Sequence, residues 1–155
     1  IDVMKANTDA VTNFTSKSDS DKKGESRQSK AGLTLPPSIA EKFLRDFGTN
    51  SEDSCDYPDF AKLVCASVEH KDSKYGILIC GTGIGMSMAA NRNPAIRAGL
   101  CKDTETAMLT RLHNDANVLC LGARVTDLNW MINIVHTFLE TEFEGGRHEK
   151  RIEKL

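Results

Sequence analysis

A cysteine that leads directly into a glycine-rich stretch is the feature of this chain best suited to chemistry. Cys80 ends the apolar run Ile77–Ile79 and is followed by glycines at every second position, namely Gly81, Gly83 and Gly85. Glycines let the backbone approach a ligand closely, and the helix formers that follow them would supply amides that attract anions. A helix N-terminus also favours the thiolate form of a nearby cysteine. Cys80 could therefore act as a base or nucleophile, or it could be an ordinary buried cysteine at a strand end.

The glycine stretch differs from the two common nucleotide-binding motifs. Gly85 is followed by Met86 and Ser87 rather than by the Lys-Ser/Thr of a Walker loop. The spacing G-x-G-x-G also differs from the dinucleotide fingerprint G-x-G-x-x-G. Asp103 lies far enough downstream for a ribose contact, but a solvated loop aspartate is the simpler interpretation. We therefore expect an anion site that is not a nucleotide site.

Two later clusters carry polar side chains that could bind or catalyse. Residues 112–117 predict a loop before a strand, in which His113 could be an acid or base, or simply part of a hydrogen-bonded turn. Near the C-terminus, Arg147 and Arg151 are four residues apart. On a helix they would share one face and could grip a dianion through forked hydrogen bonds. A solvated basic end is the alternative interpretation.

Strands and helices alternate along the chain from Asp46 onward. The patterns predict strands at residues 77–79, 96–101 and 118–122, and helices from about Pro58 and at residues 86–91, 104–111 and 127–140. We expect the last helix to bury Trp130, Ile134 and Phe138. Alternation of this kind predicts an α/β fold with a parallel sheet and helices on both faces. Asp56 and Asp59 are expected to cap a helix rather than bind a metal, because no further ligand is nearby.

Composition limits the classes of protein to consider. The chain has 155 residues and a net charge of −2, which predicts one domain without the basic field of a nucleic-acid or membrane binder. No apolar run approaches the roughly 20 residues that span a bilayer, and the first residues do not resemble a signal peptide. The odd cysteine count without C-x-x-C spacing predicts a reduced, cytoplasmic protein. These cysteines are Cys55, Cys65, Cys80, Cys101 and Cys120.

The N-terminal segment differs in composition from the rest. Residues 5–37 are largely polar and charged and have neither helical nor strand periodicity, so we expect residues 1–37 to be loosely ordered. Ser38 can cap a short helix with Glu41 in the capping-box position. The boundary of the packed domain is expected near Leu35, and residues 38–155 are expected to form a single domain.

Four stretches, in order, resemble the ribose-5-phosphate isomerase B family, whose relatives include galactose-6-phosphate isomerase subunits. They are DFGTNSEDSCDYPDFA, GILICGTGIGMSMAANR, LHNDANVLCLGAR and TFLETEFEGGRHEKR, which cover the chain from about Asp46 to its end. The resemblance implies a Rossmann-like sheet and a homodimer, or a dimer of dimers, with sites at the subunit interface. It implies a phosphorylated sugar as the ligand, and neither a cofactor nor a metal.

The resemblance also implies a role for each matching position. Cys80 resembles the base that moves a proton between C2 and C1 of the opened sugar, and His113 resembles the group that opens the furanose ring. The positions that match the anion hole for the enediolate are Gly81, Thr82, Gly83, Ile84 and Gly85. The positions that match substrate and phosphate contacts are Asn114, Arg124, Arg147 and Arg151.

Residues 4–37 depart from that family, whose members begin with a hydrophobic strand ending in an Asp-His pair that contacts the substrate. This chain contains no Asp-His pair, and Asp9 is followed by Ala10. We therefore expect the first strand of the family to be missing or replaced. Three functions follow: a ribose 5-phosphate–ribulose 5-phosphate isomerase, a galactose- or allose-phosphate isomerase subunit, or a catalytically impaired sugar-phosphate-binding or dimerisation partner.

Overall fold

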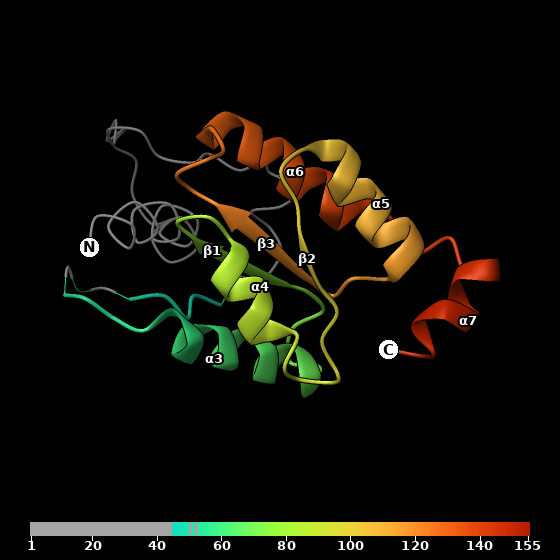
Figure 1. Cartoon of the computed structure of the whole chain (residues 1–155), viewed down its shortest axis with the longest axis horizontal. Coiled ribbons are helices and arrows are strands. Elements are labelled where there is room, and N and C mark those ends of the chain that lie inside the picture. Colours follow the sequence, from blue (N-terminus) through green and yellow to red (C-terminus); the bar gives the residue numbers. More distant parts are fainter. Residues whose placement is uncertain (1–44, 50, 52) are drawn as a thin grey trace, which may run out of the picture.

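The computed structural model of the chain describes residues 45–49, 51 and 53–155 (Figure 1). The expected loose segment 1–37, the boundary near Leu35, the helix capped by Ser38 and the replaced first strand lie outside the described residues.

Within the described residues, three parallel strands form the sheet. They are β1 (Gly76–Cys80), β2 (Ala98–Leu100) and β3 (Val118–Gly122), arranged in the order β1-β3-β2. β3 is thus hydrogen-bonded on both sides, and all five of its residues are buried. The predicted parallel sheet is confirmed, although β2 is shorter than the expected 96–101 segment.

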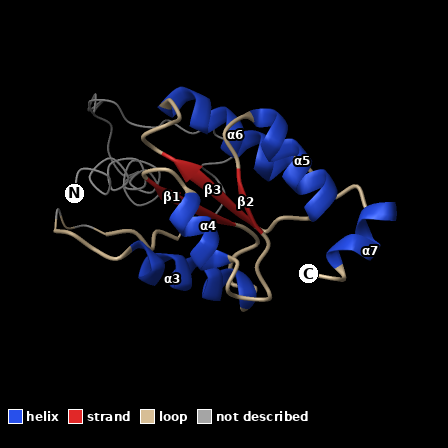
Figure 2. Ribbon diagram, viewed as in Figure 1, coloured by secondary structure: helices blue, strands red, loops and turns tan. Residues whose placement is uncertain are grey.

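Helices cover both faces of the sheet, as predicted (Figure 2). α3 (Tyr57–Glu69) and α4 (Ile84–Ala90) pack on one face, and α5 (Thr104–Asn114) and α6 (Leu128–Glu140) pack on the other. Successive side chains of a strand point to opposite faces, so β3 contributes to two separate cores. Val118 and Cys120 join the core under α3 and α4, whereas Leu119 and Leu121 join the core under α5 and α6.

Burial differs from the sequence pattern at two places. The apolar run Ile77–Ile79 is typical of a strand that is buried on both faces. Leu78 of β1 is buried, but its neighbours Ile77 and Ile79 are only half-buried. Trp130 was expected in the core and is 47% exposed. The buried face of α6 has the spacing i, i+3, i+4, i+7 and consists of Met131, Ile134, Val135 and Phe138. Trp130 lies one turn before Ile134 but at the edge of this face, so its side chain stays about half exposed.

The acidic residues at helix starts have structural roles. Asp56 is the N-cap residue of α3, although its side chain makes no capping hydrogen bond, and Asp59 in the first turn pairs with Lys62 at 3.1 Å. Asp103 caps α5 through a capping box in which its Oδ1 accepts from the Thr106 N–H at 2.7 Å. This backbone hydrogen bond is the main reason why the pKa of Asp103 is lowered. Asp103 is therefore a helix cap rather than a free loop carboxylate.

The chain ends in two short helical segments, η1 (Gly146–His148) and α7 (Glu149–Ile152). They lie beyond the C-terminal end of α5, away from the glycine-rich turn (Figure 1). None of the helices in the described part of the chain combines the length and apolar composition needed to cross a bilayer.

Candidate active site

Cys80 lies at the carboxyl end of β1, where the chain turns through glycines into α4. Gly83 adopts a φ of +75°, and a β-carbon there would lie 2.9 Å from the carbonyl carbon of Leu121. Both the backbone conformation and the space therefore require glycine at this position. The turn directs the Gly83 N–H toward Cys80 Sγ, to which it donates at 3.2 Å. The sequence correctly predicted this strand, glycine turn and helix start.

The segment after β3 closes on the glycine turn. The N–H groups of Ala123 and Arg124 donate to the carbonyl oxygens of Cys80 and Gly81, at 2.8 and 2.9 Å. A β-carbon at Gly122 would lie 2.7 Å from the Thr82 backbone, so the two segments are in close contact. The structure thus brings Cys80, the glycine turn and the exposed Arg124 to one end of the sheet.

Cys80 differs from the other buried cysteines in the backbone hydrogen bond that its sulfur accepts. Burial raises the pKa values of the Cys65, Cys101 and Cys120 thiols, and that of Cys101 rises to about 11. These three thiols therefore stay protonated at neutral pH. Cys80, which is 8% exposed, instead accepts the hydrogen bond from Gly83. Such a bond is stronger to a thiolate than to a thiol. All five cysteines are free thiols, in agreement with their odd number and spacing.

His113 and Asn114 lie in the last turn of α5, not in the loop that the sequence predicted. Asp115 ends the helix by adopting a left-handed conformation with a φ of 45°. Arg97 stabilises this helix end, because its Nε donates to the Asn114 carbonyl at 3.0 Å and its guanidinium pairs with Asp115 at 2.8 Å. The helix therefore extends past Arg111, where the pattern placed its end.

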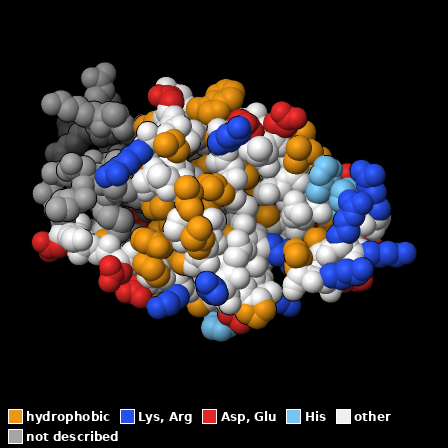
Figure 3. Space-filling model, in the orientation of Figure 1, with side chains coloured by type: hydrophobic (Ala, Val, Ile, Leu, Met, Phe, Trp, Pro, Cys, Tyr) orange, Lys and Arg blue, Asp and Glu red, His pale blue; other side chains and the backbone are white. Residues whose placement is uncertain are grey.

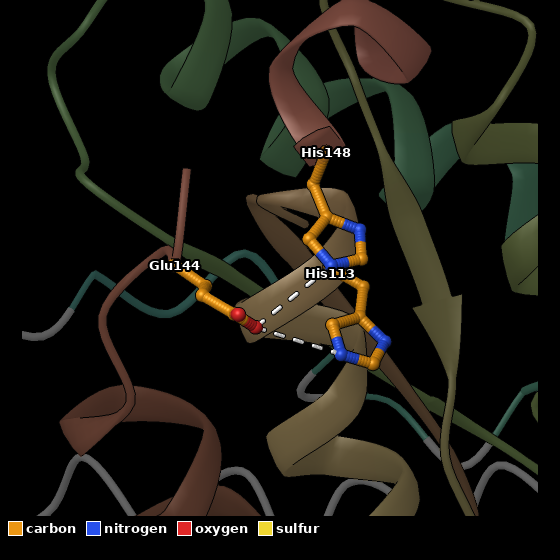
Figure 4. Close-up of side chains that lie close together, drawn as sticks. All are labelled: His113, Glu144 and His148. Atoms are coloured by element: carbon orange, nitrogen blue, oxygen red, sulfur yellow. Dashed lines mark ion pairs between the residues drawn. The ribbon is translucent and has the colours of Figure 1, made fainter. Parts of the chain in front are cut away.

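His113 belongs to a cluster that the sequence did not predict (Figure 4). The ring of His148 stacks on that of His113, with centroids 4.3 Å apart and planes at 8°. Glu144 Oε2 lies 3.7 Å from His113 Nε2 and 3.8 Å from His148 Nε2. Gly145 and Gly146, both with positive φ, turn the chain so that His148 folds back into this buried position. We call these three side chains the histidine cluster.

The two candidate phosphate binders follow one another beside this cluster. Arg147 lies in η1 and Arg151 in α7, rather than on the single helix considered from their spacing. Both are exposed, and basic side chains gather over α7 (Figure 3). Arg147 Nε donates to His148 Nε2 at 3.3 Å. Burial, and then the neighbouring His113 and Arg147, lower the pKa of His148.

A buried arginine holds the histidine end of the sheet together. Arg111 is 3% exposed, and its guanidinium donates to Asp115 and to the carbonyl oxygens of Ala116 and Thr141. It also donates to the Tyr75 hydroxyl at 3.0 Å. Sequence reasoning missed this residue, although its position one turn after the buried Ala107 placed a charge on the apolar face of α5.

The histidine cluster offers three potential metal ligands, all within 4.8 Å of one another, among the described residues. Its geometry does not favour a metal. An imidazole nitrogen binds an ion in the plane of its own ring, so two parallel, stacked rings cannot both bind one ion without rotating. The Arg147 guanidinium also occupies His148 Nε2 and adds positive charge. The stack instead holds the His113 ring in one orientation.

The two groups of candidate residues lie at opposite ends of the sheet. At the carboxyl end of the sheet, Cys80 pairs with Gly122, and at the amino end Gly76 pairs with Val118. His113 lies near the amino end, because α5 ends at Asn114, just before β3 begins at Val118. Four residue steps of strand, about 13 Å, separate these ends. Within one chain, Cys80 and His113 therefore do not meet.

Together, the parallel α/β fold, the cysteine beside a glycine-rich turn and the exposed arginines of the C-terminal segment define a small α/β protein. The sequence model of the Ribose/Galactose Isomerase family matches residues 20–155, so the chain belongs to this family. The predicted family resemblance is confirmed. We expected the matching part to start at about Asp46, but the family model already matches from residue 20.

Individual relatives agree with this assignment. The chain is 46% identical to ribose-5-phosphate isomerase B of Escherichia coli over 110 residues, which cover 71% of this chain and 74% of that protein. A crystal structure of a ribose 5-phosphate isomerase from Thermotoga maritima matches with 53% identity and a TM-score of 0.70, covering 71% of this chain and 76% of that one. Ribose-5-phosphate isomerase B from Mycoplasma genitalium with bound ribulose-5-phosphate matches with 50% identity and a TM-score of 0.66, covering 69% and 72%.

Proposed function

We propose that this chain is an aldose–ketose isomerase that interconverts ribose 5-phosphate and ribulose 5-phosphate. One observation carries the proposal: a Cys80 thiol held by the Gly83 amide at the mouth of a glycine turn, in a chain of the Ribose/Galactose Isomerase family. The related Mycoplasma genitalium structure, with ribulose-5-phosphate bound, supports a five-carbon sugar phosphate as the ligand.

In the proposed reaction, Cys80 acts as a thiolate base. It takes the proton from C2 of the open aldehyde, the electron pair forms the C1–C2 double bond, and O1 becomes the oxyanion of an enediolate. Amides of the turn from Gly81 to Gly85 would stabilise this charge where it develops, apart from the Gly83 N–H, which bonds to Cys80 Sγ, and the Ile84 N–H, which bonds to Thr82 Oγ1. The O2 proton then passes to O1, Cys80 returns its proton to C1, and C2 becomes the ketone. The proton balance closes without any group beyond the thiol and the substrate.

The residues at the other end of the sheet are assigned to binding and ring opening. His113 would protonate the ring oxygen as its bond to C1 breaks, and the hydroxyl on C1 would release its proton to solvent as C1 becomes the aldehyde. An imidazole suits this task because it can donate and accept protons near neutral pH. Asn114 beside it would contact the sugar. Arg147 and Arg151 would bind the phosphate through charge-assisted hydrogen bonds, and Arg124 would contact the substrate from the end that carries Cys80.

Because the two ends are separated within one chain, we propose that each site is completed by a second copy. Exposed apolar side chains gather over α4 (Figure 3), and Met88 on this helix is 65% exposed. Ile84, Leu100 and Val125 are also exposed, and the last two lie against the glycine turn and Gly122. Burying this patch in a two-fold dimer would bring the histidine cluster of one copy to Cys80 of the other.

Two alternatives have specific support. The family name covers galactose as well as ribose isomerases, which supports a hexose phosphate as the substrate. The sequence has no Asp-His pair of the kind that family members use to contact the substrate, which supports a protein that binds the sugar phosphate without turning it over.

A coupled isomerase assay on the purified chain tests the proposal, with ribose 5-phosphate, allose 6-phosphate and galactose 6-phosphate as substrates. We expect the highest kcat/KM with ribose 5-phosphate. A preference for either hexose phosphate would support the hexose alternative. Binding of ribose 5-phosphate by calorimetry without turnover of any of the three would support the non-catalytic alternative and contradict the proposal.

A further inference from the structure

His148 contacts two residues that the proposed function uses for different tasks. One face of its ring stacks on His113, and its Nε2 accepts the hydrogen bond from Arg147 Nε. His148 as a whole is 3% exposed, although its neighbours Arg147 and Glu149 are exposed. A histidine buried between two functional side chains requires an explanation beyond core packing.

We propose that His148 is a positioning residue that couples phosphate binding by Arg147 to ring opening by His113. The inference rests on the proposed function, because it deepens the roles assigned there to Arg147 and His113. His148 itself is not assigned any contact with the substrate.

The hydrogen bond from Arg147 fixes the chemical form of His148. A ring nitrogen that accepts a hydrogen bond carries no proton, so Nε2 is bare and a neutral ring is protonated on Nδ1. Burial and the positive charge of Arg147 favour this neutral form. A neutral ring can stack on His113 without the repulsion that two imidazolium ions would experience.

Each contact constrains its partner in a useful way. A guanidinium has five N–H donors, so using Nε on His148 leaves the two terminal nitrogens of Arg147 for the phosphate. The parallel stack restricts rotation of the His113 ring and keeps its Nε2 on the side of Glu144, at 3.7 Å. A phosphate that orders Arg147 would therefore also order His148 and, through the stack, His113.

Two substitutions separate these contacts in the full-length protein. His148→Phe keeps a flat ring for the stack and removes the acceptor, whereas His148→Gln keeps an acceptor and removes the ring. We expect His148→Phe to weaken binding of inorganic phosphate and raise KM about tenfold with little change in kcat. We expect His148→Gln to lower kcat about tenfold and to leave phosphate affinity within about twofold. The matched controls His136→Phe and His136→Gln, on α6, should change neither quantity.

The same change in KM and kcat for both variants, or no change in either, would overturn the proposal. A measurement on the unsubstituted protein adds a test that does not depend on the folding of any variant. Nitrogen-15 NMR of the His148 ring should show a protonated Nδ1 and a bare Nε2 whose resonance moves when inorganic phosphate is added. A protonated Nε2 would contradict the inference. Phosphate titration and NMR need no turnover, so absence of isomerase activity would contradict only the proposed function.

Discussion

The two ends of the sheet hold different halves of the proposed chemistry and are built in different ways. At the carboxyl end, the Cys80 turn is made of backbone: a left-handed Gly83, a close contact at Gly122 and amides that bond to sulfur and carbonyl oxygens. At the amino end, the histidine cluster is made of side chains from α5 and the C-terminal segment. Substitutions that add a β-carbon should therefore damage the first end, and substitutions that remove a side chain should damage the second.

Loss of the proposed base at the carboxyl end should slow the reaction more than any other substitution. Cys80→Ser replaces the proposed thiolate base by a hydroxyl that does not ionise near neutral pH, so kcat should fall by about 10²–10⁴-fold. Affinity for ribose 5-phosphate should stay nearly unchanged. Steady-state kinetics and calorimetry check both quantities, with Cys55→Ser as the control because Cys55 lies outside the turn. Full activity of Cys80→Ser would remove Cys80 from the mechanism.

At the amino end, loss of a phosphate contact should appear in KM rather than in kcat. Arg147→Ala or Arg151→Ala should each cost about 1.5–3 kcal/mol of binding, which corresponds to a rise in KM of about 10- to 150-fold. Lys150→Ala is the matched control, because Lys150 is an exposed cation between them on α7. If both arginine variants bind the sugar phosphate as tightly as the parent, the basic end is only a solvated terminus.

Two glycines with positive φ, one at each end of the sheet, test whether the carboxyl end depends more strongly on backbone packing than the amino end does. Gly83→Ala introduces left-handed strain and a contact with the Leu121 backbone, so we expect it to lower the free energy of unfolding by about 3 kcal/mol or more. Gly146→Ala introduces the strain alone, because no atom lies within 4 Å of its β-carbon, and should cost about 1 kcal/mol. Urea unfolding checks both values. Equal losses would mean that the close contact at the turn contributes nothing.

The smallest expected effect is the pH dependence of stability that comes from His148. Its pKa is lowered in the folded chain, so between the folded value and the ordinary value near 6.5 the unfolded chain binds more protons. His148 therefore contributes its full stabilisation above about pH 6.5, and this contribution is lost as the pH falls through that window. The groups facing it are His113, Glu144, Arg147 and Arg151. Unfolding measured from pH 8 to pH 5 should show a shallower decline in His148→Phe than in the parent.

The carboxyl end was largely predictable because its determinants are local. An apolar run, alternate glycines and helix formers specify a strand, a turn and a helix start within fifteen residues of sequence, from Gly76 to Ala90. The end of α5 was harder to predict, since Arg97, which is distant in the sequence, holds it together with the local pair of Arg111 and Asp115. Local propensity carries no information about the contact with Arg97.

The histidine cluster was not predictable from one sequence. His148 was visible beside Arg147, but nothing in the spacing between residues 113 and 148 reveals that their rings stack. Trp130 was misplaced for a related reason, since a large apolar residue next to a buried helix face satisfies the pattern without belonging to that face. Tertiary packing decides both cases.

We propose that one site needs both ends of the sheet, taken from two copies of the chain. Cys80→Ser and His113→Ala proteins, each nearly inactive alone, can be mixed in equal amounts and allowed to exchange subunits. Half of the dimers would then contain one copy of each variant. In such a dimer, one of the two sites combines the intact Cys80 of one copy with the intact His113 of the other, so about a quarter of the parent activity should return. Each variant taken alone through the same exchange is the control. A mixture no more active than its components would contradict the shared site.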